Sequence, residues 1–104
     1  MKIQVFHERE DDVAYECAEI FCPACKHTHP VTLTAPNLDI PIWNLSGTPE
    51  MPTLSPSVKI VCADEVQCHY YLTAAVMKFQ SDCKHDLAGQ WVDLPDIPTE
   101  LVRS

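Results

Sequence analysis

Cys22-Pro23-Ala24-Cys25 is a CxxC motif, in which two thiolates can converge on one metal ion from a tight turn. Further cysteines follow 43 to 61 residues later, at positions 68 and 83. A metal site shared by these distant segments would connect the two halves of the chain. Because a domain of 104 residues buries only a modest core, such a connection would be a major source of stability. The motif therefore predicts a zinc-stabilised domain.

The second half of this metal site has several candidate ligands. In a hairpin that turns near residue 74, Cys68 lies across from about residue 81, so Cys83 and His85 fall just beyond it. Either can therefore meet Cys68 at a common ion. The favoured set is Cys22, Cys25, Cys68 and Cys83, with His85 as the main substitute for Cys83. A set rich in thiolates favours zinc over a copper or iron oxygenase site.

The other cysteines and histidines have simpler interpretations. Cys17 and Cys62 are expected to be small buried hydrophobic residues. His27 and His29 are expected at the surface, although either could replace a cysteine as ligand. His69 points to the sheet face opposite Cys68 if that strand is regular. There it either packs and hydrogen-bonds, or it contributes to a separate functional pocket.

Period-2 patterns predict a mainly β fold: a single small domain of antiparallel strands, residues 1–104, with a zinc knuckle and at most one short helical turn. The expected helical turn begins at Ser81 or Asp82 and ends at Gly89. Prolines between residues 30 and 57 exclude a long helix there. Extended segments are expected at residues 3–5, 14–21, 31–34, 40–45, 58–62, 68–72 and 76–79, the last two forming a hairpin around 73–75.

Charge and hydropathy narrow the class of protein. The net charge of −8 argues against a direct nucleic-acid binder, which needs a basic face. No stretch approaches the roughly 18 apolar residues of a membrane span. No N-terminal apolar segment follows Met1-Lys2, so we expect a cytoplasmic protein. Thiols stay reduced there, and the six cysteines are better explained as metal ligands than as three disulfides.

Four motifs of this chain occur in the same order as in a known family. They are Cys22–Cys25, Pro52–Ser57, Cys68-His69-Tyr70-Tyr71, and Ser81–Gln90. Together they resemble a small family of unknown function common in phages and prophages, whose members sometimes carry the label "ammonia monooxygenase". The resemblance implies a phage or prophage accessory protein and supplies no activity. Family members have an Asp-Gly turn where this chain has Ala74-Ala75. Some have serine in place of Cys83 and keep the histidine, which favours His85 as a ligand.

Two further segments could carry chemistry. Residues 52–57, Pro-Thr-Leu-Ser-Pro-Ser, could form a serine-bearing binding loop, but a polyproline-like edge segment is the favoured interpretation. Asp82, His85 and Asp86 resemble a general acid–base set, although aspartates that cap a short helix would explain them as well.

The leading hypothesis for function is a non-enzymatic, zinc-stabilised accessory protein that engages another protein. Four thiolate-rich ligands would close the metal off from substrate. One alternative is a zinc hydrolase with three protein ligands and an activated water, using His69 or His85 with an adjacent aspartate. Another is an acidic inhibitor that mimics nucleic acid and blocks a basic enzyme.

Overall fold

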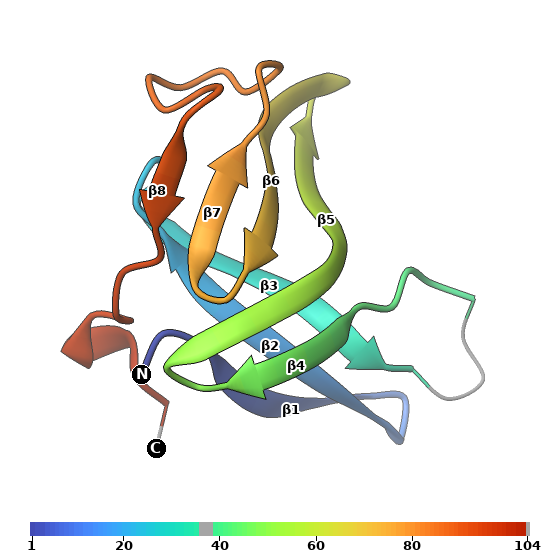
Figure 1. Ribbon diagram of the computed structural model, residues 1–104. Coiled ribbons are helices and arrows are strands. Elements are labelled where there is room, and N and C mark those ends of the chain that lie inside the picture. The colour runs from blue at the N-terminus through green and yellow to red at the C-terminus, as the bar shows by residue number, and fades with distance from the viewer. Residues whose placement is uncertain (36–38, 104) are drawn as a thin grey trace.

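The computed structural model describes residues 1–35 and 39–103 and contains two antiparallel β-sheets (Figure 1). The strands are β1 (Gln4–Glu10), β2 (Val13–Cys22), β3 (His27–Thr34), β4 (Asn44–Thr48), β5 (Met51–Cys62), β6 (Glu65–Thr73), β7 (Val76–Phe79) and β8 (Trp91–Asp93). They form a three-stranded sheet in the order β1-β2-β3 and a five-stranded sheet in the order β4-β5-β6-β7-β8. The prediction of a mainly β, antiparallel fold is confirmed.

Tight two-residue turns close three of the hairpins. The turn residues Asp11-Asp12, Ala63-Asp64 and Ala74-Ala75 all have positive φ, for example 46° at Ala74 and 65° at Ala75. Positive φ at both central residues suits the right-handed twist of antiparallel strands. The predicted hairpin around residues 73–75 is confirmed, with Thr73 paired to Val76.

Strand β5 begins earlier than the sequence indicated. Residues 52–57 are not a polyproline-like edge segment, because β5 lies between β4 and β6 in the sheet. Pro52 is tolerated as the second residue of the strand, and Pro56 falls where the pairing with β6 shifts register between Leu54 and Val58. Such a bulge accommodates a residue that lacks a backbone N–H.

The short helical turn lies at a different place from the one predicted. It is the 3-10 helix η1 (Thr99–Leu101), whereas the described residues 81–89 form turns that end at Gly89 with a φ of 76°. The proline-rich region 30–57 contains no helix in its described part, and residues 36–38 lie outside the described residues. None of the helices in the described ranges is long and apolar enough to cross a bilayer.

Both sheets contribute to one apolar core, with the three-stranded sheet lying across the five-stranded one (Figure 1). Ile20 comes from β2, and Tyr70, Leu72 and Phe79 come from β6 and β7; all four side chains are at most 1% exposed. Cys17 is buried, as predicted. Cys62 is exposed, contrary to prediction, because it is the last residue of β5, just before the turn to β6.

Candidate metal cluster and serine–histidine–aspartate site

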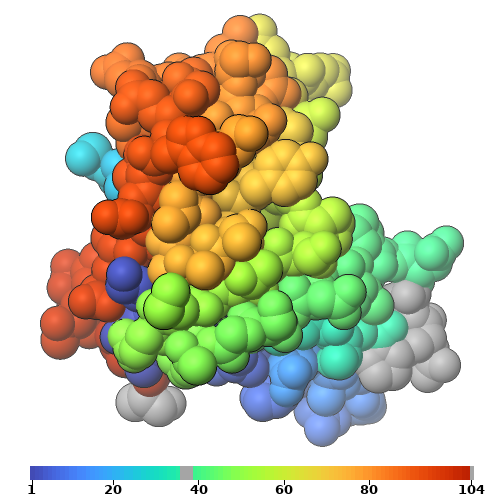
Figure 2. Space-filling view, in the orientation of Figure 1, coloured from blue at the N-terminus to red at the C-terminus, as the bar shows by residue number. Residues whose placement is uncertain are grey.

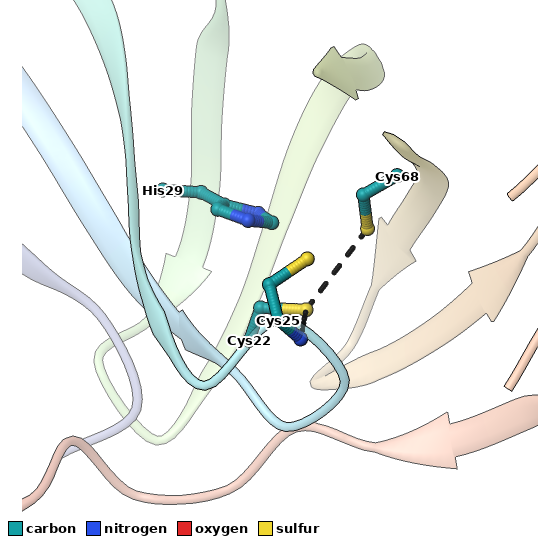
Figure 3. Close-up of side chains that lie close together, drawn as sticks. All are labelled: Cys22, Cys25, His29 and Cys68. Atoms are coloured by element: carbon teal, nitrogen blue, oxygen red, sulfur yellow. Dashed lines mark hydrogen bonds between the residues drawn. The ribbon is translucent and has the colours of Figure 1, made fainter. Parts of the chain in front are cut away.

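Four potential metal ligands converge between the β2–β3 turn and β6. The ligand atoms of Cys22, Cys25, His29 and Cys68 all lie within 4.8 Å of one another, and Figure 3 shows their side chains pointing toward one another. The Sγ atoms of Cys22 and Cys68 are 4.0 Å apart. Three soft sulfurs and one imidazole at this spacing are typical of a tetrahedral zinc site.

The β2–β3 turn brings the first two cysteines together. The backbone N–H of Lys26 donates to the carbonyl of Cys22 at 2.8 Å, and Lys26 completes the turn with a φ of 61°. The backbone N–H of Cys25 donates to Cys22 Sγ at 3.4 Å. The turn therefore directs an N–H group toward the sulfur, a recurrent way of stabilising a thiolate.

The thiols of this cluster influence one another's protonation. A hydrogen bond from Cys68 lowers the pKa of Cys22 to about 6. The same interaction, together with burial, raises the pKa of Cys68. Burial and the neighbouring Cys22 charge raise the pKa of Cys25 to about 11. One thiolate of the cluster is therefore favoured, and burial and the charge already present disfavour each further one.

His29 lies inside the protein, contrary to the expectation of a surface histidine. Its side chain is 2% exposed, and its Nδ1 lies 3.2 Å from the Tyr70 hydroxyl oxygen. Burial is the main cause that lowers the pKa of His29, to about 4, so the ring is neutral near pH 7. Its other nitrogen, Nε2, is buried and has no hydrogen-bond partner among the described residues. His27 is exposed, as predicted.

The remaining predicted ligands form a second group around the same cysteine. The ligand atoms of Cys68, Cys83 and His85 lie within 4.8 Å of one another, and Nε2 of His85 is 3.4 Å from Cys68 Sγ. The structure brings Cys22, Cys25 and Cys68 together, and their binding of a metal ion stays a prediction. The completion of the site by Cys83 or His85 stays a prediction, because the cluster also offers His29.

On the opposite face of β6, His69 takes part in a separate arrangement. Its Nδ1 lies 3.2 Å from both carboxylate oxygens of Asp82, and its Nε2 lies 3.2 Å from Ser57 Oγ. A proton on Nδ1, held by the carboxylate, leaves Nε2 free to accept the serine O–H. This is the pattern of hydrogen bonds found in a serine–histidine–aspartate triad.

Local backbone features place these three side chains. Ser57 lies within the register shift of β5, and Lys59, two residues on, is paired with His69 on β6. Bulges often redirect a side chain next to an active site. Asp82 follows β7 in a turn, and its neighbour Cys83 makes two hydrogen bonds with the main chain of His69.

The triad opens onto the outer face of the five-stranded sheet. The side chain of His69 is 21% exposed and that of Asp82 is 46% exposed. Tyr71, whose ring centroid is 6.4 Å from that of His69, and Trp91 are both exposed large hydrophobic residues on this face. Lys78 on β7 is paired with Tyr71 on β6 and with Trp91 on β8, so the three residues lie in one row across the sheet. Figure 2 shows this side of the molecule, from β5 to β8, uncovered by other elements.

The family model for the serine protease of a bacterial ubiquitination-like system, BubE, matches residues 2–80. The chain belongs to the BubE family. The match includes Ser57 and His69 and ends two residues before Asp82. No curated protein and no solved structure matches the chain. Neither a phage family nor the "ammonia monooxygenase" label is supported by the BubE match.

Sequence reasoning identified His69 and Asp82 as candidates but paired neither with Ser57. The sequence favours a polyproline-like edge segment over a serine-bearing loop at residues 52–57, and it suggests His85 and Asp86 as the partners of Asp82. The missing information is the bulge in β5, which a regular period-2 pattern does not reveal. Two prolines inside an otherwise strand-like stretch were the available signal for it.

Proposed function

We propose that this protein is a serine protease with Ser57 as nucleophile, His69 as general base and acid, and Asp82 as the carboxylate that orients His69. The observation that carries the proposal is the pair of hydrogen-bonding distances from one imidazole, 3.2 Å to Ser57 Oγ and 3.2 Å to the Asp82 carboxylate. The BubE family description supports the same class of reaction.

The proposed reaction follows from these positions. Ser57 Oγ attacks the peptide carbonyl while its proton passes to Nε2 of His69. The proton then goes to the departing amine, leaving an acyl group on Ser57 that water removes with His69 again as base. Asp82 keeps Nδ1 protonated and stabilises the imidazolium. The chain order Ser–His–Asp differs from those of chymotrypsin, subtilisin and the α/β-hydrolases, but a triad is recognised by geometry and roles.

The protein partner expected from the sequence is, in this proposal, the substrate. The family description names a ubiquitination-like system, so a protein of such a system is the first substrate to examine. The exposed Tyr71 and Trp91 offer apolar surface for an extended polypeptide on the same sheet face as the triad. The phage-type accessory role implied by the sequence resemblance is a separate proposal on which this one does not depend.

We also propose that the predicted metal is zinc and that its role is structural. Ligand atoms from the β2–β3 turn and β6 connect the two sheets, and four of them would leave no open position for substrate. This geometry does not favour the zinc-hydrolase alternative. No contact among the described residues specifically supports the acidic-mimic alternative. A reducing cytoplasm is the proposed compartment, because it preserves the thiolates.

A fluorophosphonate probe tests the catalytic proposal directly, because it reacts with activated serines. We expect one covalent adduct per chain, mapped to Ser57 by mass spectrometry, and its loss in Ser57→Ala. Ser55→Ala, two residues away on β5, is the matched control and should be labelled like the unmodified protein. Equal labelling of Ser57→Ala and the unmodified protein would refute the proposal.

A further inference from the structure

We propose that Cys22, Cys25, His29 and Cys68 bind one zinc ion in a closed tetrahedral site, and that His85 donates a hydrogen bond to Cys68 without being a ligand. This rests on the structural role proposed for the metal and specifies its ligands. It is independent of Ser57 chemistry. It also replaces Cys83, the fourth ligand favoured by sequence alone, and its substitute His85 with a histidine from the β2–β3 hairpin.

The state of the His29 ring fits a metal ligand. A neutral imidazole has one N–H and one lone pair, and a zinc-bound histidine usually donates its N–H to a fixed acceptor. Nδ1 of His29 can donate to the Tyr70 hydroxyl oxygen at 3.2 Å, which leaves the lone pair on Nε2. That nitrogen is buried without a hydrogen-bond partner in the described part of the chain. Since buried polar atoms rarely lack a partner, a metal ion accounts for it.

The hydrogen bonds of His85 indicate a different role. The backbone N–H of Leu87 donates to Nδ1 of His85 at 3.2 Å, so this nitrogen presents its lone pair to the backbone. A neutral ring then carries its proton on Nε2, the nitrogen that lies 3.4 Å from Cys68 Sγ. Nε2 can therefore donate to the Cys68 thiolate but has no lone pair for a metal. Such a donor reduces the charge density on a ligand sulfur.

Cys83 is also engaged elsewhere. Its sulfur accepts the backbone N–H of His69 and its S–H donates to the carbonyl oxygen of His69, both at 3.2 Å. A zinc-bound thiolate would have lost the proton that makes the second of these bonds. The three other cysteine thiolates of the cluster and the neutral His29 imidazole thus form a Cys3His set, which is an ordinary ligand set for structural zinc.

Substitution of zinc by Co²⁺ tests this assignment, because tetrahedral Co²⁺ has visible bands and each thiolate adds charge-transfer intensity. We expect one Co²⁺ per chain with a Cys3His spectrum. His29→Cys should keep the stoichiometry and gain charge-transfer intensity, as a fourth thiolate would require. His29→Ala should open the site to solvent and weaken zinc binding more than any change at His85.

Two other histidines supply the comparison. His85→Ala should keep the cobalt spectrum tetrahedral and weaken zinc binding by about 10- to 100-fold, as loss of an outer hydrogen bond typically does. His27→Ala, at an exposed position two residues from His29, should leave spectrum and affinity unchanged. An unchanged spectrum in His29→Cys together with a changed one in His85→Ala would overturn the assignment in favour of His85.

These measurements do not depend on catalysis. Circular dichroism of each variant establishes that it is folded, and His29→Cys retains four ligands if His29→Ala does not fold. A protein that binds Co²⁺ as expected but does not react with fluorophosphonate would refute the protease proposal alone. A protein labelled at Ser57 that binds no metal at this cluster would refute the zinc assignment alone.

Discussion

The thiol of Cys83 forms hydrogen bonds with both the N–H and the carbonyl group of His69. Its sulfur accepts the His69 N–H at 3.2 Å, and its S–H donates to the His69 carbonyl oxygen at 3.2 Å. Cys83 directly follows Asp82, which contacts the imidazole of the same histidine. One turn thus fixes both the backbone and the ring of the proposed general base.

Removal of this thiol should disturb the triad while leaving the metal in place. We expect Cys83→Ala to slow fluorophosphonate labelling of Ser57 and to lower the free energy of unfolding by about 1–3 kcal/mol, because the His69 N–H loses this acceptor, whereas the His69 carbonyl oxygen keeps the Gln80 N–H as a donor at 2.8 Å. Cys83→Ser should restore part of the labelling rate, since a hydroxyl can donate and accept. Loss of zinc stoichiometry in Cys83→Ala would instead identify Cys83 as a ligand.

The carboxylate of Asp82 should matter for rate more than for substrate binding. Asp82→Asn should lower kcat by about 10²- to 10⁴-fold, the usual contribution of a positioned acid–base system, with little change in KM. Asp86→Asn is the control, because Asp86 lies four residues further along the same turn region. Steady-state kinetics on a cleavable peptide make the comparison. Equal effects of the two changes would remove Asp82 from the triad.

The metal cluster should account for much of the folding free energy. Cys22→Ser removes a ligand from a site whose binding energy is on the order of 10 kcal/mol and is coupled to folding. Cys17→Ser, at another buried cysteine of β2, should cost about 1–3 kcal/mol through a poorly satisfied hydroxyl. Thermal denaturation of both variants gives the comparison, and equal shifts in Tm would contradict a metal at Cys22.

The exposed aromatic residues on the same sheet face as the triad should affect substrate affinity. Trp91 is 68% exposed, with Nζ of Lys78 4.9 Å from its ring centroid. If an extended polypeptide lies along this face, Trp91→Ala should raise KM and leave fluorophosphonate labelling unchanged. Val61→Ala removes another exposed hydrophobic side chain, of β5, and serves as the control. An unchanged KM for Trp91→Ala would place the substrate elsewhere.

The turn between β6 and β7 should be a source of avoidable strain. Ala74 and Ala75 adopt positive φ, which costs an L-residue with a Cβ roughly 1–2 kcal/mol. Ala74→Asn combined with Ala75→Gly supplies the residues preferred in such a turn. We expect the double variant to gain about 1 kcal/mol and to raise Tm by about 4–8 °C. A lower Tm would show that the contacts of the Ala75 methyl group outweigh the strain.

The sequence predicts this fold well where local pattern determines it. Alternating residues identified most strands, and the β6–β7 hairpin was located correctly with Thr73 beside Val76. The sequence does not predict the full extent of β5. Its prolines are accommodated by the way β5 pairs with its neighbouring strands, and the residues of β5 alone do not indicate that pairing. The same long-range packing buries His29 under Tyr70, which no spacing rule applied to residues 22–29 can reveal.

The separation of the two sites onto opposite faces could also be predicted, since neighbouring residues of a regular strand point in opposite directions. The partners of His69 could not. Ser57 and Asp82 are 12 residues before and 13 residues after it in the chain. Only the alignment of β5, β6 and the turn after β7 brings them together.

Cys68 and His69 are neighbours on β6, one facing the buried cluster and the other facing Ser57. Displacing this strand by a single residue against β5 would exchange the two faces, turning the imidazole inward and the thiol toward solvent. A misaligned molecule would lose both the proposed metal site and the contact between His69 and Ser57. If the cluster binds zinc as proposed, zinc content would measure correct strand alignment in any preparation, recombinant or native.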